Sequence, residues 1–359
     1  MKVIIMVTAL LISMISTAKD KRYKWQYKTL THELLQIEEL TYPDTDAFHK
    51  QFDESYLAID KLITACKKDI GTEIPNDSIG VLQLLKTIDL NLVKNNFYIC
   101  VQILRLSEGL ILKPEGTYKC TYCDFLQPLR GNYFDHTKLA YHIDCDLGSF
   151  LYISVAEALN LPLKFVETKN HNFVRWVFND GKYLNWDVNV GSDFTDDNYR
   201  HGKIIAVSSF DKEEEINYKY LMNFQREEIF GYYYLVIGRR LKKDKNYSLA
   251  KQYYQAAIEK QELFYQKHCL AYMLIFSGAF KSIDDYKYAN MLEKQASPYY
   301  LKDKEIAETL ACSYALIGDF KAAIQTIDDA NADQDLKNEF LKGDTGINLF
   351  RKKHPDYLN

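Results

Sequence analysis

The chain has 359 residues, a formal net charge of −4 and seven cysteines. This length allows two or three domains. The slightly acidic balance and the lack of a basic stripe exclude nucleic acid as a partner, because binding to phosphates needs clustered lysine and arginine side chains.

The first predicted element is a secretory signal peptide over residues 1–18. Lys2 supplies the positive charge, residues 3–12 form the apolar run, and small residues lead up to Ala18, after which the chain turns polar. This run is short for a membrane span, although an uncleaved anchor is the alternative, and no later segment approaches ~18 consecutive apolar residues. We therefore expect an exported protein, periplasmic or secreted, with no stable membrane span after cleavage.

Residues 19–125 are predicted to form a helical N-terminal region. Apolar residues recur at helical spacing in two stretches, 48–70 and 80–95, and Pro75 lies in the turn between them. Each stretch should bury one face. The residues expected in the core are Phe52, Tyr56, Ile59, Leu62 and Ile63 in the first stretch and Val81, Leu84, Leu85, Ile88 and Leu92 in the second.

The cysteines indicate at least one free thiol, because an odd number cannot pair completely within an exported chain. If Cys145 is that thiol, the other six allow up to three disulfides. Cys269 and Cys312 lie in apolar helical stretches, which favours buried free thiols. Cys120 and Cys123 form a CxxC pair, for which a disulfide or plain thiols are expected, with redox activity or a metal as the alternatives.

Residues 126–210 are predicted to form an α+β core. A helix is expected at 146–160, followed by strands at 162–167, 171–178 and 182–188. A helix followed by antiparallel strands is an α+β arrangement. The loop-rich segment 116–145 leads directly into the helix and should form the rim of a site.

Three residues of this core have the order and spacing of a thiol-enzyme triad: Cys145, His171 and Asp187. Cys145 opens the predicted helix, His171 opens a strand, and Asp187 closes the next strand. A helix N-terminus and a nearby imidazolium both lower the pKa of a thiol, and the carboxylate holds the imidazole in one tautomer. We expect these three residues to be catalytic, with no cofactor and no metal.

The turn between the last two strands decides whether His171 and Asp187 share a face of the sheet. If residues 179–181 form a three-residue loop with Gly181 in the left-handed region, His171 faces Asn189. Asp187 is then the diagonal neighbour of His171 on the same face, whereas a two-residue loop would put it on the opposite face. Asn189 lies in the same row and is expected as a second orienting group.

The charged residues beside Cys145 act against catalysis. Asp144 and Asp146 flank it, and two neighbouring carboxylates should raise the pKa of the thiol and oppose the effect of the helix terminus.

Other side chains around the triad have expected places as well. Arg175 lies on the face of His171, where it would meet a substrate carboxylate or pair with Asp187. The aromatic residues should lie in the core, with the last of them on the face opposite Asp187; they are Phe173, Trp176 and Trp186.

Residues 215–345 are predicted to form helix pairs. Tyr247, Phe280 and Phe320 each follow a turn between two apolar-periodic helices, and their spacing resembles the tetratricopeptide repeat of about 34 residues, with a longer loop in the second interval. The repeat's tryptophan and proline positions are missing. Three such pairs would stack into a short α-solenoid whose concave face takes a protein or peptide partner.

The segment that runs from Cys145 through Leu161-Pro162 to His171 and Trp186-Asp187 resembles the transglutaminase-like superfamily. In that family a cysteine opens a helix with a Gly-Ile-Pro-like exit, and histidine and aspartate motifs follow. The resemblance covers roughly residues 126–205 and implies a papain- or transglutaminase-like core. One branch with appended tetratricopeptide repeats has lost the cysteine; this chain resembles it in the HNFVRW and NWDVNVG segments and keeps a cysteine.

Two functions follow from these expectations. The first is an exported cysteine acyl-transfer enzyme, in which Cys145 attacks an amide, His171 moves the proton and Asp187 orients His171. Backbone N–H groups at the start of the helix would help to stabilise the oxyanion. Water as the acceptor gives a protease or amidase, and an amine gives a transglutaminase. The alternative is a non-catalytic scaffold that binds partners through its repeats.

Overall fold

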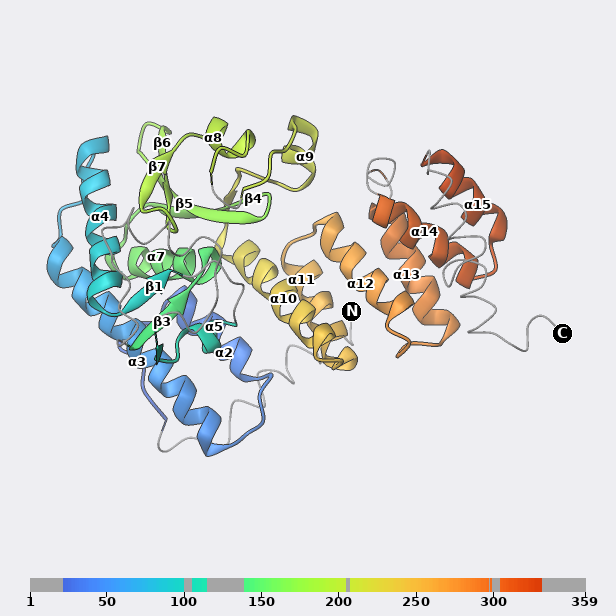
Figure 1. Cartoon of the computed structure of the whole chain (residues 1–359), viewed down its shortest axis with the longest axis horizontal. Helices are drawn as coiled ribbons and strands as arrows, with labels where there is room; N and C mark the ends of the chain where they lie inside the picture. The colour runs from blue at the N-terminus through green and yellow to red at the C-terminus, as the bar shows by residue number, and fades with distance from the viewer. Residues whose placement is uncertain are drawn as a thin grey trace. The chain divides into compact units, whose positions relative to one another are not determined.

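The computed structural model describes residues 22–99, 105–114, 139–204, 207–296, 298 and 304–330 (Figure 1). The predicted signal peptide, the CxxC pair and the end of the predicted repeat region lie outside these residues. Two compact units divide the chain. The first runs to Lys212 and also includes Tyr220–Phe224, and the second contains Glu213–Lys219 and the chain from Gln225 onward.

Three helices begin the first unit: α2 (Leu30–Glu39), α3 (Asp46–Ile70) and α4 (Ser78–Lys94). Thr45 and Asp77 cap α3 and α4 by accepting a backbone N–H of the first turn, which satisfies a donor that the helix itself cannot. The predicted apolar faces are confirmed, because all ten expected core residues are buried. These are Phe52, Tyr56, Ile59, Leu62, Ile63, Val81, Leu84, Leu85, Ile88 and Leu92.

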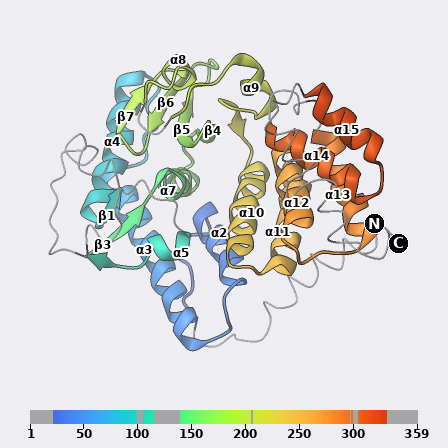
Figure 2. The ribbon, with the colours of Figure 1, turned by 45° about the vertical axis from the view of Figure 1, so that its right-hand side comes forward.

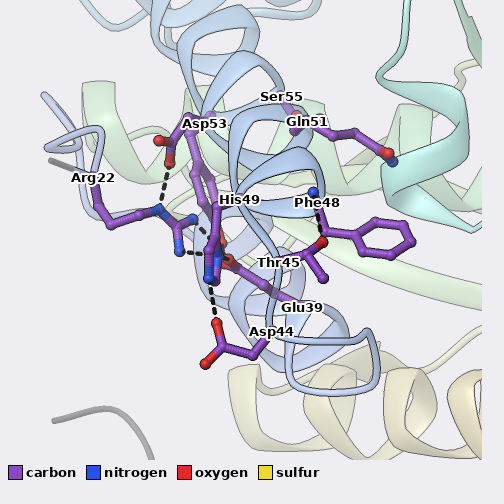
Figure 3. A network of polar contacts seen from close by, with 10 residues as sticks. Arg22, Glu39, Asp44, Thr45, Phe48, His49, Gln51, Asp53 and Ser55 are labelled. Carbon is purple, nitrogen blue, oxygen red and sulfur yellow. Dashed lines mark hydrogen bonds and ion pairs between the residues drawn. The ribbon is translucent and has the colours of Figure 1, made fainter. Parts of the chain in front are cut away.

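Ion pairs tie the segment before α2 to α2 and α3. Arg22 donates to Asp53 at 3.0 Å and pairs with Glu39 at 2.6 Å, and His49 lies between Glu39 and Asp44 (Figure 3). These groups are partly exposed, so water and salt weaken each pair. Together they hold an otherwise extended segment along α3.

A five-stranded antiparallel sheet forms the centre of the first unit, in the order β7-β6-β5-β4-β8. The three predicted strands are present as β4 (Leu163–Thr168), β5 (His171–Val177) and β6 (Tyr183–Asp187). The two edge strands, β7 (Ser192–Phe194) and β8 (Asn223–Phe224), were not predicted. Both are too short to show a period in the sequence.

Helix α7 (Cys145–Leu159) packs on one face of this sheet (Figure 1). Phe150 stacks on Phe165 of β4, and the Trp186 indole N–H donates to the Tyr152 hydroxyl. Phe165 pairs with Val174, so the even-numbered residues of β5 and β6 face the helix. The expectation that Trp186 lies opposite Asp187 is therefore confirmed, as is the burial of the three aromatic residues Phe173, Trp176 and Trp186.

Gly148 allows α7 to approach the sheet closely, since a Cβ atom there would lie 2.6 Å from Val188 Cγ1. We expect Gly148→Ala to destabilise the protein by about 1–3 kcal/mol, because the clash exceeds the ~1 kcal/mol that alanine adds to a helix. Urea unfolding measures this change. A variant that is more stable than the wild type would show that α7 does not pack as described.

A second, small sheet joins the N-terminal helices to the core. Strand β3 (Leu139–Ile143) pairs in parallel with β1 (Phe97–Ile99) and antiparallel with β2 (Lys113–Pro114), and α5 (Leu106–Gly109) lies between these strands in the sequence. The helical region predicted at 19–125 therefore contains strands as well, and it shares one compact unit with the core. The parallel pairing of β1 with β3 joins segments far apart in the sequence, which local periodicity does not reveal.

The second unit consists of successive helix pairs (Figure 2). These are α10 (Arg226–Lys243) with α11 (Tyr247–Lys260), α12 (Phe264–Phe276) with α13 (Ile283–Ala296), and α14 (Lys304–Leu316) with α15 (Phe320–Asp329). The predicted helix pairs are confirmed over these residues. The pairs start later than residue 215, because α9 (Lys212–Asn217) is followed by β8, which returns to β4 of the first unit. None of the described helices is both long and apolar enough to cross a membrane.

All four cysteines within the described residues are free. Cys66 and Cys312 are buried, whereas Cys145 and Cys269 are half-buried. The expected free state of Cys269 is confirmed, but its expected full burial is wrong. Because four of the seven cysteines are free, three disulfides do not form.

Candidate active site

Cys145 is the first residue of α7, and Asp144 is its N-cap. The Asp144 carboxylate accepts the N–H of Leu147 at 3.0 Å, and its carbonyl accepts the N–H of Gly148 at 2.9 Å. These two donors of the first turn are therefore not open to an oxyanion. Oxyanion stabilisation by this helix must therefore come from N–H groups nearer to its start.

The hairpin between β5 and β6 has the predicted three-residue loop. Gly181 has a φ of 80°, and Phe178 donates its N–H to the carbonyl of Lys182 at 2.8 Å. Strand pairing follows in the expected register, with Val174 opposite Trp186. This register places His171 and Asp187 on one face of the sheet, so the structural part of the prediction is confirmed.

His171 and Asp187 form a buried pair. The His171 Nε2 lies 2.7 Å from Asp187 Oδ2, and the two side chains are 1% and 0% exposed. The other carboxylate oxygen accepts the backbone N–H groups of Asn189 and Val190, each at 3.0 Å. An acceptor on Nε2 fixes the neutral imidazole with its proton there and leaves Nδ1 as a proton acceptor. Nδ1 is buried and has no hydrogen-bond partner.

The Cys145 thiol lies next to Asn172, the residue after His171. The backbone N–H of Asn172 donates to the sulfur, and the Asn172 side-chain amide donates to the Asp146 carboxylate. Asn172 faces α7, whereas His171 points to the other face of the sheet. The structure therefore brings His171 and Asp187 into contact and places Cys145 beside Asn172, and His171 Nδ1 has no hydrogen bond to the thiol.

The pKa of the Cys145 thiol is raised well above its ordinary value. Burial is the main cause, followed by the negative charges of Asp146 and Asp144; the N–H of Asn172 opposes them, and Asp187 adds a further increase. The expected effect of the flanking carboxylates is thus present in the structure. At neutral pH the thiol is protonated, and it needs a base to become a nucleophile.

Neutralising the two flanking carboxylates should lower the thiol pKa. In the double variant Asp144→Ser with Asp146→Asn, serine keeps a helix cap and asparagine keeps an acceptor for Asn172. Removing two like charges should lower the apparent pKa of the thiol, so alkylation of Cys145 by iodoacetamide extends to lower pH. Mass spectrometry of the Cys145 peptide across a pH series measures this shift.

The matched control is Asp180→Asn, which removes a carboxylate from the far end of the β5–β6 hairpin. It should leave the alkylation profile of Cys145 unchanged. An identical profile in the double variant and in the wild type would mean that the flanking charges do not control the thiol.

Arg175 does not take either of its expected roles. Its guanidinium is buried, donates to Asn185 at 2.7 Å and to the carbonyl of Leu221 at 2.9 Å, and pairs with Asp196 at 2.6 Å. All of these partners are structural, so Arg175 is not placed to meet a substrate and does not pair with Asp187. Asp196 lies in a loop-and-helix segment whose position the sequence pattern did not indicate.

The expected orienting role of Asn189 is not observed for its side chain. Its Oδ1 is buried without a hydrogen-bond partner, and only its backbone N–H contacts Asp187. Two residues that sequence reasoning missed, Asn172 and Tyr199, contact the predicted site instead. Asn172 adjoins His171 in the sequence, so its position near the site could have been predicted, whereas its side-chain contact with Asp146 could not.

Among the described residues, no three His, Cys, Asp or Glu side chains are arranged to hold a metal ion.

No family model, curated protein or solved structure matches the chain. The geometry of the first unit is therefore the basis for any functional conclusion.

Proposed function

We propose that the protein is an exported thiol enzyme that transfers or hydrolyses an acyl group through Cys145, His171 and Asp187. The observation that carries this proposal is the buried His171–Asp187 pair whose Nδ1 has no partner, next to a half-buried cysteine at a helix start. A buried polar atom without a partner costs about 1–3 kcal/mol, and a catalytic role is one explanation for such an atom. An imidazole that must receive a proton is such a case.

The proposed reaction begins with the protonated thiol. The S–H proton moves to His171 Nδ1 as the sulfur attacks an amide carbonyl and a C–S bond forms. The amide C–N bond then breaks, the leaving amine takes the proton from His171, and a thioester remains on Cys145. Water releases a carboxylic acid from this thioester, or a second amine forms a new amide. Asp187 stays ionised and supports the positive charge on His171.

The raised thiol pKa favours general-base activation over a preformed thiolate–imidazolium pair. In this mechanism the thiol and Nδ1 must come together when the substrate binds, since catalytic hydrogen bonds are often long before then.

The mixed helix and sheet architecture is consistent with a papain- or transglutaminase-like core, which we propose from the resemblance in sequence. The helix pairs of the second unit are proposed as tetratricopeptide-like repeats that recruit a protein or peptide substrate. Export is proposed from the N-terminal sequence pattern, and N-terminal sequencing of the exported protein should begin at Lys19.

The proposal is tested with a glutamine-containing peptide and a fluorescent primary amine. Amine incorporation into the peptide would identify a transglutaminase, and release of ammonia or cleavage of the peptide without incorporation would identify an amidase or protease. Cys145→Ser should remove either activity while leaving the unfolding curve unchanged. Activity that persists in this variant would contradict the assignment.

A non-catalytic scaffold is the second candidate. The carboxylates beside Cys145 and the lack of a thiol–imidazole hydrogen bond favour it. A scaffold should not form an acyl-enzyme, so the two functions differ in whether an activated ester acylates Cys145 selectively.

A further inference from the structure

Tyr199 lies on the face of the sheet opposite to α7, directly against the His171–Asp187 pair. It belongs to the short helix α8 (Asp196–Arg200) and is completely buried. Its ring stacks on Phe173 with centroids 4.0 Å apart, and its centroid is 6.4 Å from that of His171, again with nearly parallel planes. The ring therefore supports the row of side chains that holds the imidazole.

The hydroxyl of Tyr199 reaches the same carboxylate oxygen as His171. It donates to Asp187 Oδ2 at 3.4 Å, whereas the His171 Nε2 is at 2.7 Å from this oxygen. The two donors thus share one acceptor, and the longer bond is the weaker. Burial and the charge of Asp187 raise the pKa of Tyr199 well above its ordinary value, so the hydroxyl remains a donor at all pH values of interest.

A set of polar contacts fixes α8 in this place. The Asp196 carboxylate accepts from Arg175 at 2.6 Å, from Asn185 at 2.8 Å and from the Tyr183 hydroxyl at 2.8 Å. The Arg175 guanidinium also lies over the Tyr183 ring, 4.1 Å from its centroid. The side chains on this face of β5 and β6 therefore anchor the first residue of the helix that carries Tyr199.

We propose that Tyr199 is a positioning residue: its ring and hydroxyl hold the His171–Asp187 pair in the geometry that leaves Nδ1 to accept a proton. The catalytic consequence rests on the proposed thiol chemistry, whereas the effect on His171 does not. Among the described residues, the titratable groups that contact the His171 ring are Asp187 on β6 and Tyr199 on α8.

The sign of the effect follows from the shared oxygen. The positive end of the hydroxyl dipole lies beside the imidazole N–H and opposes a positive charge on the ring. In Tyr199→Phe the ring stack remains and only this donor is lost, so the shared Asp187 oxygen is left to the imidazole N–H. We expect the hydrogen bond from His171 Nε2–H to Asp187 to shorten.

The experiment is NMR of histidine-labelled protein, wild type and Tyr199→Phe, with His171→Gln to assign the signal. The quantity read is the chemical shift of the His171 Nε2–H proton. Loss of the competing donor should move this proton downfield, because the bond to Asp187 shortens. An unchanged chemical shift in Tyr199→Phe would overturn the inference.

Tyr152→Phe is the matched control. Tyr152 is also fully buried against this sheet, but it lies on the opposite face and bonds Trp186 and the carbonyl of Leu85. This variant should lose stability and leave the His171 Nε2–H signal in place. A shift in the control as large as in Tyr199→Phe would show a general packing effect. If Cys145 proves inert, the acyl-transfer proposal fails, and the His171 Nε2–H signal still decides the role of Tyr199.

Discussion

In Asp187→Asn, acylation of Cys145 by an activated ester should slow by about a thousand- to ten-thousand-fold. The asparagine oxygen will keep the backbone N–H groups of Asn189 and Val190, which the present carboxylate binds at 3.0 Å. Its amide N–H₂ then faces His171 Nε2, and the imidazole must move its proton to Nδ1 to avoid two opposed donors. An Nδ1 that carries a proton cannot accept one from the thiol.

The Asn189 side chain is not in place to compensate for this loss, because it makes no hydrogen bond to His171. Asp193→Asn is the control, since it makes the same chemical change at an exposed position of β7 in the same sheet. We expect the control to react as fast as the wild type. An acylation rate for Asp187→Asn within about ten-fold of the wild type would show that Asp187 does not set the tautomer of His171.

We expect the largest effect on stability from the loss of the Asp60 side chain. Asp60 lies on α3 and accepts hydrogen bonds from the segment before α2. Its carboxylate accepts the Tyr23 hydroxyl and the Gln26 N–H at 2.7 Å each and the Tyr27 N–H at 3.2 Å, and it lies 3.3 Å from His32 Nε2. Asp60→Ala leaves these donors, most of them partly buried, without their acceptor. The free energy of unfolding should fall by about 3–5 kcal/mol, because several hydrogen bonds to a buried carboxylate are lost together.

Urea unfolding of Asp60→Ala measures this loss. Asp53→Ala is the control on the same helix, because Asp53 bonds the partly exposed Arg22 and should cost less than about 1 kcal/mol. Burial and, to a smaller extent, Asp60 raise the pKa of Tyr23 to about 12. The pKa of Tyr23 should therefore fall toward its ordinary value in Asp60→Ala. Equal losses of unfolding free energy in the two alanine variants would mean that the burial of Asp60 does not increase its contribution to stability.

Local patterns predicted the hairpin and the helices well. Residues 179–181 contain a glycine at the one position that requires a positive φ, and this alone sets which face Asp187 occupies. The buried face of α3 was readable because its apolar residues repeat at helical spacing over many turns.

Contacts between distant segments were not predictable in this way. Strand β8 has two residues and exists because they pair with β4, which lies far away in the sequence. Arg175 was given a role at the substrate, but Asp196 and Asn185 bind it, and their positions depend on how α8 folds back over the sheet. Whether Cys145 meets His171 also depends on how the helix start lies against the strand, which the spacing of the three residues does not determine.

The most direct test of the account is acetylation by p-nitrophenyl acetate, followed by peptide mass spectrometry. The account predicts an acetyl group on Cys145 in preference to the other free thiols. His171→Gln should remove this preference, because no group then takes the proton from the thiol. Acetylation spread over Cys145 and Cys269 according to their exposure, at the same rate in His171→Gln, would contradict the account.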